Sequence, residues 1–203
     1  MKQPLCSVVC PSRNGAAKVI KMIKSIAESA DDSQNVEFII RLHDDEPKHL
    51  QAISEIVAAA PRVRIAVGPT LRGYASLDKF FDEAIALSTG KWIWQLNDDA
   101  IIEGQGWDTK LAEIENWKCI VIPQLHQLNE SLYSNDQGSP FPMVPRGTIF
   151  TPEQQPLPYP PDTKLTSSLL ESGHKLIFLE GIKTHHQREV DPIVEAQRQA
   201  GAI

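Results

Sequence analysis

The sequence of 203 residues is poor in cysteine and has no long apolar run, and both shortages narrow the classes of protein it can belong to. Its three cysteines, Cys6, Cys10 and Cys119, form no CxxC pair, so neither a disulfide framework nor a zinc ribbon is indicated. Because all three lie in apolar stretches, we expect them to be buried thiols in a reducing, cytoplasmic setting. The short apolar run 5–10 does not predict a signal peptide, and we expect any membrane contact to be peripheral.

A surplus of basic charge is also missing. Lys and Arg number 20 against 26 Asp and Glu, and the net charge of -6 argues against a nucleic-acid binder. The fingerprints GxGxxG and GxxxxGK[ST] do not occur, which excludes a dinucleotide oxidoreductase and a P-loop NTPase. Basic residues could still line a local pocket for a phosphorylated small molecule, although each alone is more typical of a solvated surface. The candidates are Arg13, Arg62, Arg64, Arg72 and Lys79.

The first half of the chain alternates apolar strand-like runs with segments of helical periodicity. The predicted strands are 5–10, 36–42, 63–67 and 92–96, and the predicted helices are 16–30, 49–60 and 74–88. This order is typical of an α/β protein with a mostly parallel, Rossmann-like sheet and helices on both faces. The length fits one domain, 1–203.

The second half is less regular. We predict helices at 107–116, 162–172 and 192–200, strands at 118–123 and 174–179, and loops at 100–106 and 181–191. Asp162 is the predicted N-cap of its helix, and Gly173 the residue that ends it. The irregular segment 124–161, rich in proline, is interpreted as a cover over the substrate.

Acidic pairs follow two of the predicted strands. Asp98 and Asp99 come after 92–96, and Asp44 and Asp45 after 36–42. In open α/β sheets, ligands bind outside the carboxyl ends of the strands. Adjacent carboxylates there favour a Mg²⁺ or Mn²⁺ site, although Asn-Asp-Asp also fits a polar turn that caps the next helix.

Several segments resemble, in order, the GT-A-fold glycosyltransferases of the large family-2 type. The resemblance covers most of the chain. Its segments are Val-Val-Cys-Pro-Ser-Arg-Asn at 8–14, the strand 39–45 with its two aspartates, the segment 73–90, Asn97-Asp98-Asp99 in place of Asp-x-Asp, Asp162, and the histidine pair 185–186.

The resemblance implies an inverting transfer of a sugar from a UDP- or GDP-linked donor to a hydroxyl acceptor such as a glycan. It implies that 1–99 bind the nucleotide, that 100–203 carry the acceptor and catalytic groups, and that Asp162 is the base. Asp99 with His185 or His186 would hold Mn²⁺ or Mg²⁺, and Tyr133 is a candidate for acceptor stacking. The implied nucleotide-binding residues are Pro11, Ser12, Arg13, Asn14, Asp44, Asp45, Arg72 and Asp98.

A catalytically degenerate module of the same fold, which binds a nucleotide or glycan without turnover, is the main alternative. Asn97 favours it, because its side chain can ligate a metal only through a neutral oxygen. A nucleotidyltransferase is less favoured, because the turn after the first strand has a single glycine, Gly15. On the residues alone, Asp162 fits a simple N-cap, and His185 and His186 fit surface positions.

Overall fold

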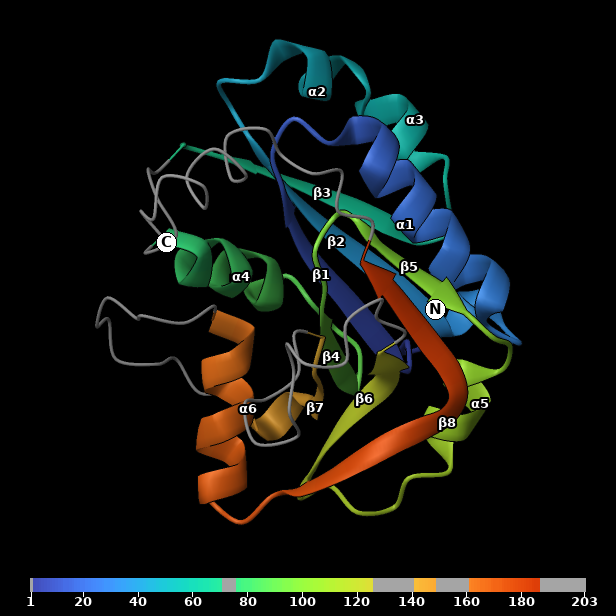
Figure 1. Ribbon diagram of the computed structural model, residues 1–203. Coiled ribbons are helices and arrows are strands. Elements are labelled where there is room, and N and C mark those ends of the chain that lie inside the picture. The colour runs from blue at the N-terminus through green and yellow to red at the C-terminus, as the bar shows by residue number, and fades with distance from the viewer. Residues whose placement is uncertain (1, 71–75, 126–140, 149–160, 187–203) are drawn as a thin grey trace, which may run out of the picture.

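The computed structural model describes residues 2–70, 76–125, 141–148 and 161–186 (Figure 1). These residues form an eight-stranded sheet in the order β3-β2-β1-β4-β7-β6-β8-β5. The strands are β1 Cys6–Ser12, β2 Val36–His43, β3 Val63–Gly68, β4 Trp92–Gln95, β5 Ala100–Glu103, β6 Cys119–Leu125, β7 Met143–Pro145 and β8 Lys175–His186. The helices are α1 Ala16–Ser29, α2 Pro47–Gln51, α3 Ile53–Val57, α4 Leu77–Ala86, α5 Trp107–Ala112 and α6 Pro161–Glu171, with short 3-10 turns η1 Ser33–Asn35 and η4 Arg146–Thr148.

The four strands of the first half are parallel, as their nearly continuous apolar character predicts. Val8 of β1 lies opposite Phe38 of β2 and Trp94 of β4, and all three side chains are fully buried. Strands buried on both faces read as unbroken apolar runs, because helices cover each side. α1, α3 and α5 contribute to one core cluster, while α4 and α6 contribute to a second on the opposite face (Figure 1). The predicted α/β class is therefore confirmed.

The second half is mixed and contains strands that the sequence does not predict. β7 pairs antiparallel with both β4 and β6, and it lies inside the segment 124–161 that we interpreted as irregular. The loops predicted at 100–106 and 181–191 are also wrong in part, because β5 pairs antiparallel with the end of β8. These pairings are long-range, and short strands next to proline or charged residues carry little local signal.

Helix boundaries also differ from the predictions. The helix predicted over 49–60 is two short helices, α2 and α3, which meet at Ala52. α6 begins at Pro161, which favours the first position of a helix, so Asp162 lies inside the first turn and is not the N-cap. Gly173, with φ +84°, follows the helix end as predicted. The helix predicted at 192–200 lies outside the described residues.

The order in which successive strands join the sheet reverses at β1. β2 and β3 are added on one side of β1, and β4 is then added on the other. Such a switch point leaves a crevice at the carboxyl ends of the two neighbouring strands, where α/β proteins bind ligands. No helix among the described residues has the length and apolar character needed to cross a membrane.

Candidate nucleotide-binding site

The switch point brings the ends of β1 and β4 into direct contact. The Ser12 hydroxyl donates to Asp98 Oδ2 at 2.6 Å. A Cβ built on Gly15 would collide with the same carboxylate, so the turn after β1 closes on Asp98 only because residue 15 has no side chain. Burial raises the pKa of Asp98, although the hydrogen bond from Ser12 opposes that shift. Two predicted site residues, Ser12 and Asp98, are therefore neighbours.

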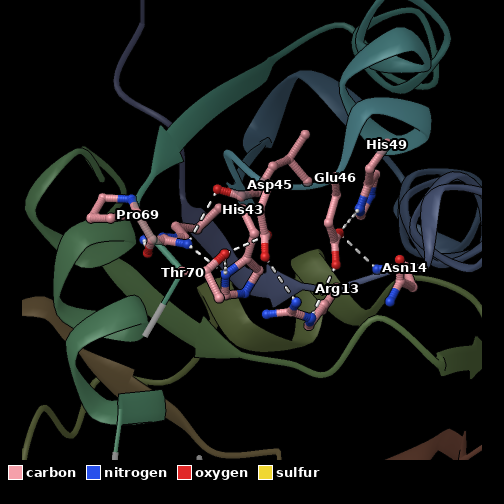
Figure 2. Close-up of polar contacts among 10 residues, drawn as sticks. Arg13, Asn14, His43, Asp45, Glu46, His49, Pro69 and Thr70 are labelled. Carbon is pink, nitrogen blue, oxygen red and sulfur yellow. Dashed lines mark hydrogen bonds and ion pairs between the residues drawn. The ribbon is translucent and has the colours of Figure 1, made fainter. Parts of the chain in front are cut away.

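Asp45 receives donors from two other turns at the same edge. Arg13 Nη2, from the turn after β1, lies 3.1 Å from Asp45 Oδ2, and both side chains are about half exposed. The Thr70 hydroxyl, from the segment after β3, donates to Asp45 Oδ1 (Figure 2). The hydrogen bond from Thr70 and the charge of Arg13 lower the pKa of Asp45. Asp45 is thus held ionised as an acceptor at the carboxyl edge of the sheet.

Glu46 is a buried part of the site that the sequence analysis did not identify. Its Oε2 accepts the backbone N–H of Asn14 at 2.8 Å, and His49 Nδ1 lies 3.1 Å from the same oxygen. Its Oε1 lies 3.2 Å from Arg13 Nε. Figure 2 shows these groups gathered between the turn after β1 and the start of α2. An acidic residue beside Asp44 and Asp45 gives no local signal that it alone points inward.

Arg41 is a second residue that sequence reasoning missed. It is fully buried, and it donates to Glu83 at 2.8 Å and to the Pro69 carbonyl at 2.8 Å. Its Nη1 lies 3.2 Å from His43 Nδ1. Because arginine only donates, His43 accepts at Nδ1, and burial together with the charge of Arg41 lowers the pKa of His43. The signal was present as a lone arginine within an apolar strand.

The main chain brings His185 and His186 next to the two residues that follow Asp99. Asp99 immediately precedes β5, in which Ala100 lies opposite His186 and Ile101 opposite His185 of β8. One carboxylate and one imidazole suit Mg²⁺ or Mn²⁺ when substrate phosphates complete the coordination, so this donor set fits the predicted ion. Among the side chains that the structure describes, no group of three His, Cys, Asp or Glu is arranged to hold a metal by itself.

The remaining predicted residues have different outcomes. Pro11 lies within β1, and Asp44 is exposed at the end of β2, where its backbone N–H donates to the Gly68 carbonyl at 3.1 Å. Arg72 and Tyr133 lie outside the described residues.

Two of the basic pocket candidates lie away from the crevice. Arg64 pairs with Glu37 at the amino end of β2, and Arg62 donates to the Lys2 carbonyl. The suggestion that Arg62 and Arg64 line a phosphate pocket is therefore wrong.

Together, a mostly parallel sheet and acidic side chains at its switch point are typical of an α/β domain with a ligand site at the carboxyl edge of its strands. Residues 7–168 match the model of the family described as glycosyl transferase family 2. The chain belongs to this family, which confirms the resemblance inferred from its sequence. No curated protein matches the sequence.

Solved glycosyltransferases share the fold. A fragment of S. aureus TarS in complex with UDP superposes with a TM-score of 0.64 at 11% identity, covering 88% of this chain and 59% of that one. The same fragment with UDP-GlcNAc gives 0.67 at 13%, covering 93% and 60%. Mannosyltransferase PcManGT from Pyrobaculum calidifontis, in complex with GDP-Man and Mn2+, gives 0.74 at 13%, covering 98% and 61%. This chain thus spans about three fifths of each of these proteins.

Proposed function

We propose that this chain transfers a sugar from a nucleoside diphosphate sugar to an acceptor hydroxyl. Membership of glycosyl transferase family 2 supports the class of reaction. The observation that carries the proposal is a pair of contacts at the carboxyl edge of the sheet, Arg13 with Asp45 and Ser12 with Asp98, which join the turn after β1 to the turns after β2 and β4. The similar structures that hold UDP, UDP-GlcNAc or GDP-Man support a uridine or guanosine donor.

The nucleotide is assigned to residues 1–99. Asp45, with Asp44 beside it, accepts hydrogen bonds from the base or ribose, and the lowered pKa of Asp45 keeps its acceptor oxygens ionised. Arg13 and Arg72 pair with phosphate oxygens through their planar guanidinium groups. The hydrogen bond from Ser12 to Asp98 holds the turn after β1 against the end of β4, with Pro11 and Asn14 shaping the turn.

The metal is assigned to Asp99 with His185 or His186. The antiparallel register of β5 and β8 supports this assignment, because it sets the two histidines next to the residues that follow Asp99. A bound Mn²⁺ or Mg²⁺ would supply positive charge to the leaving diphosphate. The complex of PcManGT with Mn2+ supports a divalent ion in a protein of similar fold.

The acceptor side is assigned to residues 100–203. Asp162, in the first turn of α6, takes the proton of the acceptor hydroxyl as that oxygen attacks the anomeric carbon. Attack from the face opposite the leaving diphosphate inverts the configuration at that carbon. Tyr133 is the candidate for stacking against the acceptor.

Calorimetric titration with UDP and GDP, with and without Mn²⁺, tests this proposal directly. We expect one nucleotide to bind in a Mn²⁺-dependent manner and to lose that dependence in Asp99→Ala. Glu113→Ala, which removes an exposed carboxylate at the C-terminal end of α5, is the control and should bind as the unsubstituted chain does. Turnover is then measured as hydrolysis of UDP- or GDP-linked sugars, which is detected by the release of the nucleotide.

A non-catalytic module that binds a nucleotide or glycan is the second candidate, and Asn97 is the observation that favours it. A neutral oxygen at that position weakens a metal site relative to a carboxylate. This candidate predicts tight nucleotide binding that does not require Mn²⁺, with no release of nucleotide from any donor sugar. Asn97→Asp would then increase the dependence of binding on Mn²⁺.

A further inference from the structure

Glu46 joins three neighbouring groups through one buried carboxylate. The residue is 6% exposed, and its oxygens meet the Asn14 N–H, His49 Nδ1 and Arg13 Nε within 2.8–3.2 Å. Burying a carboxylate is unfavourable unless its oxygens are paired. These pairings tie the start of α2 to the turn between β1 and α1, which the chain separates by more than a whole helix and strand.

The turn that Glu46 holds has an unusual backbone. Asn14 has φ +54°, and it is the one non-glycine residue with positive φ among the described residues. A residue in the left-handed region persists when surrounding contacts hold it there. Glu46 supplies such a contact at the Asn14 N–H, and Asp98 holds the two sides of the same turn through Ser12 and the close approach of Gly15.

The same carboxylate also orients Arg13. Nη2 donates a hydrogen bond to Asp45 at 3.1 Å, and Nε lies 3.2 Å from Glu46 Oε1 in an ion pair without a hydrogen bond, so two carboxylates on the turn after β2 hold the guanidinium from neighbouring positions. Arginine recognises a phosphate group through the geometry of its planar donors, and a fixed plane reduces the entropy lost on binding. Arg13 is half exposed, so its guanidinium remains accessible to a ligand in the crevice.

We propose that Glu46 is a positioning residue for the nucleoside diphosphate. It holds Asn14 in the left-handed conformation and sets the plane of the Arg13 guanidinium toward the diphosphate. This inference rests on the proposed function, because it assumes that Arg13 contacts the nucleotide.

A role of Glu46 through its negative charge and a role as a positioning residue predict opposite changes in nucleotide affinity when Glu46 is replaced. If Glu46 acted only through its negative charge, its removal would strengthen the binding of an anionic diphosphate. Under the positioning role, Glu46→Ala weakens binding of UDP or GDP with Mn²⁺ by about tenfold or more, because both the turn and Arg13 lose their support. Glu46→Gln keeps an oxygen that can accept the Asn14 N–H, so it should retain much of the affinity.

Titration calorimetry of the full chain with UDP and GDP in Mn²⁺, paired with hydrogen exchange at the Asn14 amide, tests the proposal. We expect faster exchange at that amide in Glu46→Ala than in Glu46→Gln. In a double-mutant cycle, Arg13→Ala should cost much less affinity in the Glu46→Ala background than in the unsubstituted chain.

Asp108→Ala is the matched control. Asp108 is also a buried carboxylate that accepts two backbone N–H groups, those of Asp31 and Asp32, but it lies at the opposite end of α1. We expect this variant to lower the melting temperature without changing nucleotide affinity.

Different outcomes test the positioning role of Glu46 and the proposed function. If Glu46→Ala binds as tightly as the unsubstituted chain, or more tightly, the positioning role is wrong while the proposed function stands. If Asp108→Ala weakens binding as much as Glu46→Ala, the effect of Glu46 is one of general stability and the inference is overturned. If the unsubstituted chain binds neither nucleotide, both the proposed function and this inference are overturned.

Discussion

A Cβ built on Gly15 would collide with the Asp98 carboxylate and would lie 3.0 Å from the Ser12 hydroxyl. Gly15→Ala therefore forces the turn after β1 away from β4, and we expect a loss of about 1–3 kcal/mol in stability together with weaker nucleotide binding. Urea unfolding and titration calorimetry measure the two effects. Gly147→Ala is the control, because nothing lies within 4 Å of its added carbon. Equal stability of the two variants would contradict the close contact at Gly15.

Thr70 influences the pKa of a single residue, Asp45. The hydrogen bond from its hydroxyl is the largest influence that lowers the pKa of Asp45. Thr70→Val removes this donor while keeping the shape of the side chain, so the pKa of Asp45 should rise toward its ordinary value. Carbon NMR of the Asp45 carboxyl group during a pH titration measures the change. Thr109→Val, which removes a hydroxyl that donates to Asp31, should leave the Asp45 titration unchanged.

Glu37 acts at the scale of elements, because it connects the amino ends of several strands. It accepts from Ser7 of β1 at 2.5 Å, from the turn at Thr89 and Gly90 before β4, and from Arg64 of β3. Burial alone would raise its pKa, but the hydrogen bonds from Ser7, Thr89 and Arg64 outweigh that effect and lower it.

A depressed pKa of Glu37 makes its stabilisation depend on pH. The contribution is fully present above the pKa of the unfolded chain, near 4.5, and it is lost as pH falls through the lower folded value. Glu37→Gln should therefore be less stable than the unsubstituted chain by about 2 kcal/mol at pH 7, and the difference should shrink below pH 4. Chemical unfolding across pH 3–7 measures this, and a difference that does not change with pH would show that the charge of Glu37 is not responsible.

Local pattern predicts the elements of the first half, and in the second half it predicts α5, α6, β6 and the start of β8. It misses β5, β7 and the end of β8 for a physical reason. β1 and β2 are almost entirely buried, so their sequences are apolar runs that predict strands. β7 and the end of β8 instead owe their conformation to partners distant in the chain, and the sequence 181–186 is polar enough to read as a loop. The paired aspartates could be predicted because each pair directly follows an apolar run that predicts a strand. Glu46 and Arg41 were not, because their importance lies in which way each side chain points.

The three thiols report on the whole molecule. Cys6, Cys10 and Cys119 are free and fully buried, and burial raises the pKa of each. A buried thiol with a raised pKa reacts only when the structure opens, since the thiolate is the reactive form. Labelling with a thiol reagent under native conditions should therefore be slow at all three positions and should accelerate together on unfolding.

Nucleotide binding should slow this labelling, which links stability of the whole sheet to the proposed site. A ligand that binds only the folded state reduces the open population by the factor 1 + [L]/Kd, so labelling should fall about 100-fold at a concentration 100 times Kd. The test compares the labelling rate with and without UDP or GDP in Mn²⁺, under conditions where reclosing is faster than labelling. Asp99→Ala should remove the Mn²⁺-dependent part of the protection. If one cysteine labels quickly and is unaffected by ligand while the other two are protected, that thiol reacts through a local opening, and the sheet does not open as one unit.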